Sequence, residues 1–214
     1  NGGGLKYDYF SPNEKHRFNV FASAQHINRD SYYGGGQDLN AYGNTTDLNW
    51  MAGSQYVYSF GKCIFMPSDL TAGIEFNQDK LEDNMWGYHR TVDQKVNIGS
   101  AFLQNEWKND HWGFLLGGRL DKHNMVDNVI FSPRANLRFN PTQNINLRLS
   151  YSSGFRAPQA FDEDMHIENV GGTVAMIERA KNLKEEKSQS FSASADMYHR
   201  FGVFQTNFLI EGFY

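Results

Sequence analysis

The 214-residue sequence has a single cysteine, Cys63, and its longest uninterrupted apolar runs contain only four residues. One cysteine excludes an internal disulfide framework and any zinc site built on several cysteines. A membrane-spanning helix needs about 20 consecutive apolar residues, so no such helix is predicted. The sequence also lacks an initiator methionine and a signal segment, opening instead with Asn1 and three glycines. This start predicts a piece cut from a longer chain.

An excess of positive charge is missing as well. The 20 basic and 24 acidic residues give a net charge of −4, which argues against a nucleic-acid partner held by phosphate contacts. Aromatic residues are abundant at 15%, and 20 glycines stand against only 5 prolines. Aromatic residues are enriched in strands, so this composition favours β-structure.

Apolar and polar residues alternate along segments of about ten residues, as expected for strands with one apolar face. The clearest segment is 145–155, whose apolar face consists of Ile145, Leu147, Leu149, Tyr151 and Phe155. The pattern predicts nine strands, at 16–26, 49–60, 70–79, 97–108, 111–121, 129–139, 145–155, 189–200 and 203–214.

The predicted connections differ in length on the two sides of the sheet. Short turns at 109–110, 140–144 and 200–202 alternate with long stretches at 27–48, 81–96 and 156–187, and a medium loop at 122–128 falls where a long one is due. This alternation is typical of an all-β, antiparallel up-and-down transmembrane β-barrel. A soluble β-sandwich is the alternative. Against it, aromatic residues at predicted strand ends would form an interfacial girdle: Phe60, Trp107, Trp112, Phe139 and Tyr214.

Two sequence boxes resemble the TonB-dependent outer-membrane receptors. Residues 154–158 read Gly-Phe-Arg-Ala-Pro, and residues 182–188 read Asn-Leu-Lys-Glu-Glu-Lys-Ser, with Glu185 where the family usually has proline. Residues 38–43 and 53–60 also look like barrel sequence from Bacteroides-type members. The resemblance implies part of a barrel of about 22 strands in the outer membrane of a Gram-negative bacterium. Residues 1–214 would then be one partial barrel domain, with the plug domain and the remaining strands outside them.

The same resemblance implies active uptake of a scarce nutrient, namely a ferric siderophore, haem or cobalamin. The expected partners are outer-membrane lipid, the TonB complex acting through the missing plug, and a small-molecule ligand. No cofactor is expected, and iron or cobalt would enter only as part of the ligand. An enzyme is not expected, because no nucleophile elbow, metal triad or paired Ser and His is recognisable. The alternatives are a passive porin and an adhesive or saccharide-binding β module.

Aromatic residues in the predicted long loops are candidates for ligand contact, since large rings on outer loops have little other reason to face water. They are Tyr32, Tyr33, Tyr42, Trp86 and Tyr88, with His89 beside them. Packing of these rings on one another is the alternative. His166 lies between the two boxes, where the haem receptors of the family have an axial iron ligand. Neighbouring acidic residues favour an ordinary hydrated loop instead.

Arginines gather on the polar face of the best-patterned strands, namely Arg134, Arg138, Arg148 and Arg156. They would form a cationic wall that holds an acidic plug surface or guides an anionic ligand, or they would pair with carboxylates of the barrel interior. Arg156 precedes Pro158, so it also has a role in ending its strand. Scattered His and Met residues would suit copper, but their spacing is loose: Met85, His89, His123, Met125, Met165 and His166.

Overall fold

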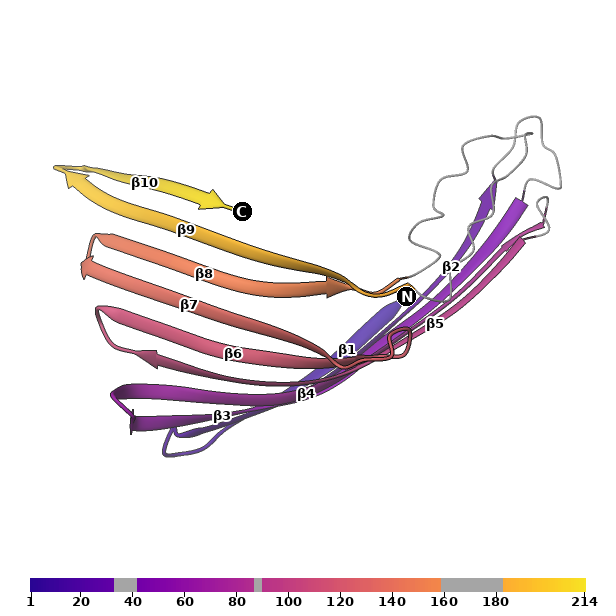
Figure 1. The fold of residues 1–214 in the computed structure, drawn as a ribbon, viewed down its shortest axis with the longest axis horizontal. Helices are drawn as coiled ribbons and strands as arrows, with labels where there is room; N and C mark the ends of the chain where they lie inside the picture. Colours follow the sequence, from indigo (N-terminus) through magenta and orange to yellow (C-terminus); the bar gives the residue numbers. More distant parts are fainter. Residues whose placement is uncertain (33–41, 87–89, 159–182) are drawn as a thin grey trace.

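The computed structural model describes residues 1–32, 42–86, 90–158 and 183–214. In these residues the chain forms one curved antiparallel sheet, in which each strand pairs with the next along the sequence (Figure 1). The ten strands are β1 (Gly2–Phe10), β2 (His16–Tyr32), β3 (Tyr42–Cys63), β4 (Met66–Met85), β5 (Arg90–Lys108), β6 (Trp112–His123), β7 (Ile130–Thr142), β8 (Ile145–Arg156), β9 (Glu186–Phe201) and β10 (Phe204–Phe213). No helix in the described part of the chain is long and apolar enough to cross a membrane.

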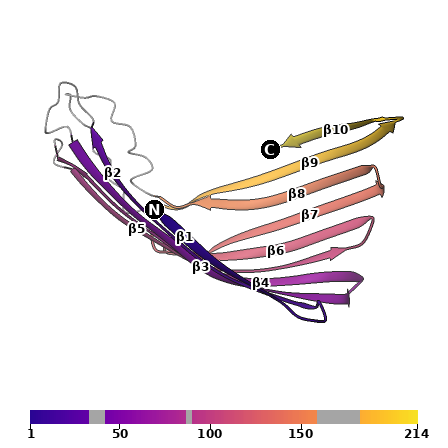
Figure 2. The same cartoon turned by 180° about the vertical axis from the view of Figure 1, so that it is seen from behind.

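The connections confirm the predicted alternation. Five short turns join β1 to β2, β3 to β4, β5 to β6, β7 to β8 and β9 to β10, and they lie together at one end of the sheet (Figures 1 and 2). We call this the short-turn end and the opposite one the long-loop end. The all-β, up-and-down topology is therefore as predicted.

The prediction of nine strands was wrong by one. The missing strand is β1, which pairs with β2 from Gly2↔Gln25 to Phe10↔Arg17. Its sequence begins with three glycines, which have no side chains to create a period-two pattern. Backbone pairing with a well-patterned neighbour forms the strand nonetheless.

The predicted loops at 27–48 and 81–96 were also wrong over most of their length. β2 continues to Tyr32 and β3 starts at Tyr42, while β4 continues to Met85 and β5 starts at Arg90. These strands have 17, 22, 20 and 19 residues, about twice the predicted length. The additional residues do not show the clear alternation of apolar and polar side chains seen toward the short-turn end, so the sequence pattern did not predict them as strand.

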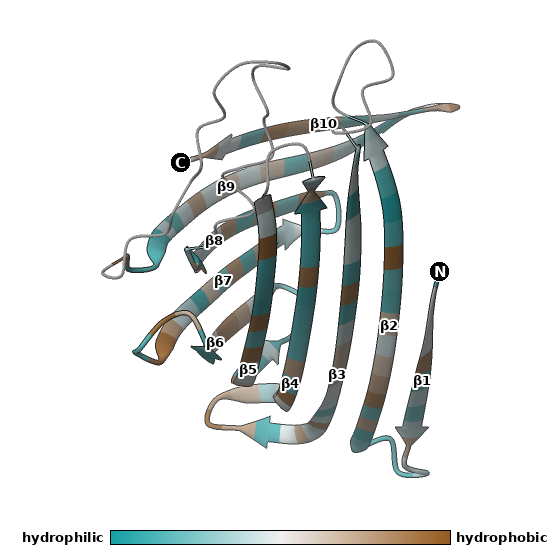
Figure 3. Cartoon of the chain, turned by 90° about the vertical axis from the view of Figure 1, so that its right-hand side faces the viewer, coloured by the Kyte–Doolittle hydropathy of each residue, from teal (hydrophilic) through white to brown (hydrophobic). Residues whose placement is uncertain are grey.

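The two faces of the sheet differ in chemistry, and the register places like residues in rows across it. On one face, which we call the apolar face, large side chains stay exposed: Ile74, Leu103, Leu116, Leu120, Phe131 and Leu149. On the other, the polar face, polar side chains are buried: Thr45, Thr71, Asp83, Ser100, Asp121 and His123. In Figure 3 the alternation of apolar and polar residues along the strands is seen as brown and teal bands. Exposed apolar and buried polar groups reverse the usual arrangement in water.

The arrangement inverts toward the long-loop end of β4 and β5. Beyond Gln78 and Asn97, which pair directly and share a hydrogen bond of 2.7 Å, the apolar face becomes charged. It continues with Lys80, Glu82, Asp93 and Lys95. The opposite face there buries Leu81, Met85 and Val96. The upper parts of these strands therefore have the polarity of a protein in water, and the lower parts do not.

Aromatic rings cluster at the short-turn end of the apolar face. The ring centroids of Trp112 and Phe139 are 4.2 Å apart, and those of Phe65 and Trp107 are 5.6 Å apart. Phe60 packs edge-on against Tyr58. Tyr214 differs from the expected strand-end group, because it lies at the opposite end of the last hairpin and exchanges two 2.9 Å backbone hydrogen bonds with Phe191.

Rows of paired residues climb along the sheet. One row passes through His16, Tyr58, Leu70, Asn105, Leu116, Ala135, Tyr151, Phe191 and Tyr214. It begins beside the β1–β2 turn and ends far from the β9–β10 turn. Such a stagger is what tilted strands of a barrel require.

Candidate functional site

The polar face is the candidate functional surface, because it carries most of the described ion pairs. Its centre is Arg119 on β6, whose Nε lies 2.8 Å from Asp121 and whose Nη1 lies 3.2 Å from Glu75. Its Nη2 donates to the Ser100 hydroxyl at 2.7 Å, and Ser100 donates to Asp121 at 2.6 Å. All three nitrogens of the guanidinium are thus engaged. This network was not predicted from the sequence. The available signal was the spacing of Arg119 and Asp121, two residues apart and therefore on one face of β6.

A second network lies at the short-turn end of the polar face. Asp69 accepts hydrogen bonds from Ser59 at 2.6 Å, from Lys108 at 3.0 Å and from Arg17 at 3.1 Å. Lys108 also lies 3.3 Å from Glu106. Two basic and two acidic side chains balance one another here.

A third group occupies the long-loop end of β2–β4. Thr45 donates to the carboxylate of Asp83, which is only 2% exposed, and receives a 3.4 Å hydrogen bond from Arg29. Next to it, Asp47 and Asp79 are diagonal neighbours across β3 and β4. Burial raises the pKa of Asp47, and the charge of Asp79 and a hydrogen bond with it raise that pKa further.

Two of the aromatic residues predicted to contact a ligand lie side by side in the structure. Tyr32 and Tyr42 pair directly at the ends of β2 and β3, with ring centroids 4.7 Å apart. By parity both belong to the outward-turned face that carries Trp50, and not to the polar face. Trp86 follows β4 and is 57% exposed. Tyr33, Tyr88, His89 and His166 lie outside the described residues.

Arg156 ends β8 opposite Glu186, and its Nη1 lies 3.8 Å from that carboxylate. Both side chains are largely exposed, so the pair contributes little. The next residue, Ala157, is buried against Val126 and Ile130. The role of Arg156 in ending its strand stays a prediction.

The other three predicted arginines behave differently from Arg119. Arg138 and Arg148 are directly opposite each other on β7 and β8, and Arg134 lies on the same face. In the residues that the structure describes, none of the three forms an ion pair with a carboxylate. Pairing with interior carboxylates, one of the expected alternatives, is therefore not what the described part of the chain provides.

His89, Met165 and His166 lie outside the described residues, and the other His and Met candidates do not all lie together. His123 is 1% exposed and pairs with Ile98, which pairs in turn with Asn77. Met85 is eight residues beyond Asn77 on β4, roughly 27 Å along the strand at about 3.4 Å per residue. The described residues contain no group of three or more His, Cys, Asp or Glu side chains able to hold a metal.

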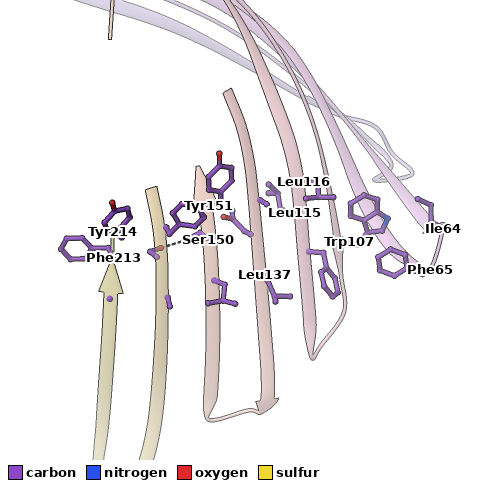
Figure 4. Close-up of a pocket in the computed structure, with 18 residues that line it drawn as sticks. Ile64, Phe65, Trp107, Leu115, Leu116, Leu137, Ser150, Tyr151, Phe213 and Tyr214 are labelled. Carbon is purple, nitrogen blue, oxygen red and sulfur yellow. Dashed lines mark hydrogen bonds between the residues drawn. The ribbon is translucent and has the colours of Figure 1, made fainter. Parts of the chain in front are cut away.

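A hollow of about 840 Å³ lies mainly on the apolar face of β5–β10 (Figure 4). Its walls include Phe65 and Trp107 at one side and Tyr151 and Tyr214 at the other. Ser150 and Ser192 also border it, but by parity they belong to the polar face, where their hydroxyls hydrogen-bond to each other at 2.6 Å. A groove of this chemistry suits hydrocarbon.

The comparison with family models decides between barrel and sandwich. The model described as "TonB dependent receptor-like, beta-barrel" matches residues 1–214. The chain belongs to the TonB-dependent receptor family. Members of this family are outer-membrane β-barrels of Gram-negative bacteria. In outer-membrane barrels generally, the outward side of the strands is apolar and meets lipid, and the inward side is polar.

Solved receptor structures share the fold at low sequence identity. The chain is 16% identical to the ferric enterobactin receptor of Pseudomonas aeruginosa, with a TM-score of 0.74 over 92% of this chain and 32% of that one. The chain is also 16% identical to the siderophore receptor PirA of Acinetobacter baumannii, with a TM-score of 0.64 over 96% of this chain and 33% of that one. It is 14% identical to a ferric citrate transporter, with a TM-score of 0.63 over 92% of this chain and 32% of that one. No curated protein matches the chain by sequence.

The chain thus spans about a third of the length of these receptors. Each of them is a receptor or transporter and not an enzyme, in agreement with the expectation for this chain. Haem and cobalamin receptors are not among these three structures.

Proposed function

We propose that the complete protein is an outer-membrane receptor for energy-coupled uptake of a scarce nutrient, with a ferric siderophore as the first candidate ligand. The observation that carries the proposal is the reversed polarity of the sheet. Below Gln78 and Asn97 it exposes large apolar side chains, and on the other face it buries Asp121 and Ser100 beside the half-buried Arg119. That arrangement is stable only with lipid on one side and a polar interior on the other.

The ligand class is supported by the similar structures, which include a ferric enterobactin receptor, siderophore receptors and a ferric citrate transporter. In this proposal the short turns face the periplasm and the long loops face the outside. Residues 1–214 form one partial barrel domain. Outer-membrane lipid covers the apolar face, and the TonB complex acts through a plug domain outside these residues.

First contact with the ligand is assigned to the long-loop end. Trp86 is well exposed there, and at the same end the rings of Tyr32 and Tyr42 pack on each other in a tilted arrangement. The same assignment includes Tyr33, Tyr88, His89 and Arg156. Large aromatic side chains supply contact area at low entropic cost. His166 is kept as the axial ligand only for the case in which the nutrient is haem.

The test is a titration of the purified full-length protein in detergent with several ferric siderophores, ferric citrate, haem and cobalamin. Binding is followed by calorimetry and, for haem, by its absorbance band. Saturable binding of one ferric chelate supports the proposal. If haem binds instead and His166→Ala abolishes the binding, the nutrient is haem and His166 its ligand. If nothing binds and the reconstituted protein conducts ions, a passive porin is the better interpretation.

A further inference from the structure

Three basic side chains lie in one row across the lumen face, near the periplasmic end. Lys108 on β5 pairs with Gly113 on β6, Gly113 pairs with Arg138 on β7, and Arg138 pairs with Arg148 on β8. Gly113 has no side chain, and Arg138 fills the space above it: a Cβ at position 113 would lie 3.2 Å from the Arg138 Nε. The row therefore brings the three basic side chains close together around Gly113.

The charges in this row are not balanced. Lys108 forms ion pairs with Asp69 and Glu106, and the nearby Arg17 forms one with Asp69. Arg138 has only a backbone partner, since its Nη2 donates to the Asn109 carbonyl at 3.0 Å. Arg148 donates from Nε to the Asn146 side-chain oxygen at 2.8 Å. Within the described residues, neither arginine forms an ion pair with a carboxylate.

Such an arrangement asks for an anion from elsewhere. Like charges directly opposite on neighbouring strands destabilise a sheet. The same wall shows how the protein treats a cation that it neutralises itself, because Arg119 is fully engaged by Glu75, Asp121 and Ser100. Arg138 and Arg148 keep guanidinium nitrogens directed at no acceptor of the described chain.

A cavity of about 290 Å³ lies at this place, lined among others by Lys108, Arg138, Arg148, Asn136, Ser150 and Glu106. Its volume is just below the roughly 300–1,000 Å³ of sites that enclose whole small molecules, so it suits one or two functional groups of a larger partner. A guanidinium fork matches the two oxygens of a carboxylate. The carboxylate of Glu106 in the lining disfavours a doubly charged phosphate.

We propose that Arg138 and Arg148 form a carboxylate-binding subsite at the periplasmic end of the lumen. The subsite rests on the proposed function in one respect, namely that the sheet encloses a lumen through which a ligand leaves. The carboxylate has two sources: an anionic chelate in transit, or an acidic side chain of the receptor's own polypeptide that lies in the lumen. In both cases the two arginines supply the charge, and Asn136 and Ser150 supply neutral polar neighbours.

The first arm of the test is a calorimetric titration of the full-length receptor with citrate as the probe. The variant is the double substitution Arg138→Gln/Arg148→Gln, and the matched control is Lys15→Gln/Lys62→Gln. The control removes two charges from exposed side chains near the same end of the sheet, outside the cavity lining. For a ligand in transit we expect citrate binding that weakens at least tenfold in the variant and less than twofold in the control. Arg138→Lys/Arg148→Lys, which keeps the charge and loses the fork, should lie between.

The second arm covers an internal carboxylate, which would block citrate. In that case the wild type does not bind the probe, but the double variant unfolds at a lower temperature than the control, and the difference shrinks in high salt. Heat-modifiable gel mobility shows which variants are folded. If citrate binding and unfolding temperature are the same in wild type and double variant, the subsite is overturned.

The two proposals fail in different ways. A receptor that binds a ferric chelate but shows neither effect keeps its proposed function and loses the subsite. A protein that binds no chelate, yet shows the salt-dependent unfolding difference, loses the proposed ligand class and keeps the subsite.

Discussion

The guanidinium of Arg119 on β6 lies 3.2 Å from the carboxylate of Glu75 on β4, although β5 runs between these two strands. Ser100 on β5 completes the bridge by accepting a hydrogen bond from the same guanidinium. One side chain thus ties three strands together. Because its partner Asp121 is only 3% exposed, loss of the arginine would leave a buried carboxylate with one hydrogen bond from Ser100.

Replacing Arg119 by Gln should therefore destabilise the folded barrel. Breaking a buried pair costs about 3–5 kcal/mol, and the partial exposure of this arginine reduces the expected loss to about 2 kcal/mol. Denaturant unfolding of the full-length protein in lipid or detergent measures it. Lys62→Gln, an exposed residue of β3 near the short-turn end, is the control. An Arg119→Gln protein as stable as this control would show that the bridge contributes nothing.

Gly73 should not tolerate even a methyl group. A Cβ there would overlap the Phe102 ring and would lie 2.9 Å from the Ser54 carbonyl oxygen. The ring can move, but the backbone oxygen cannot move without strain, so Gly73→Ala should cost about 1–3 kcal/mol. Gly99→Ala is the matched control, because a Cβ at position 99 meets nothing within 4 Å. Equal unfolding midpoints for the two variants would contradict the close approach.

Asp47 should make stability depend on pH. Burial and then Asp79 raise the pKa of Asp47 above its usual value. The folded state therefore holds this proton more tightly than the unfolded state, and the resulting stabilisation is present at acid pH and lost as the pH rises through the raised pKa. Asp47→Asn should be more stable than wild type at neutral pH, and the difference should disappear toward about pH 4.

Unfolding midpoints between about pH 4 and pH 8 would test this prediction. Asp110→Asn, in the exposed β5–β6 turn, is the control and should follow the wild-type profile. A constant offset between Asp47→Asn and wild type at every pH would refute the proton linkage and leave only a packing effect.

The β3–β4 turn carries backbone strain at Ile64. Its φ is +64°, in the left-handed region that a β-branched residue rarely adopts, and its side chain is 81% exposed. Ile64→Gly should stabilise the hairpin by about 1 kcal/mol, because glycine has no steric penalty there and little packing is lost. Ile64→Val keeps the branch at Cβ and should behave like wild type. A less stable Ile64→Gly would mean that lipid-side contacts of this side chain outweigh the strain.

The sequence predicted topology better than strand length. Alternation from Ile145 to Phe155 predicted β8 because successive side chains of this strand belong in turn to the apolar and the polar face of the sheet. The upper parts of β4 and β5 gave no such signal, since water meets their outward face and apolar packing occupies the inner one. β1 escaped because Gly2, Gly3 and Gly4 carry no side-chain pattern.

For the candidate site, the sequence predicted which face of a strand a residue occupies, but not which residues of neighbouring strands it contacts. The register places the arginines of β7 and β8 together on the polar face of the sheet, as predicted, because parity fixes the face of a strand residue. That Arg119 is neutralised and Arg138 is not depends on register between strands, which a single sequence does not specify. Tyr32 and Tyr42 share the outward-turned face because both strands extend farther than the pattern indicated.

In the proposed receptor, the change of surface chemistry at Gln78 and Asn97 would set the depth of the protein in its bilayer. Two residues higher, Lys80 and Lys95 pair directly on the outward face. A displacement toward the periplasm by that distance, roughly 7 Å at about 3.4 Å per residue, would carry both ammonium groups into the hydrocarbon. Each Lys costs up to about 2–4 kcal/mol at the bilayer midplane and less near the interface. An equal displacement outward would bring Trp50 and Phe76 into water, so vertical motion is resisted in both directions.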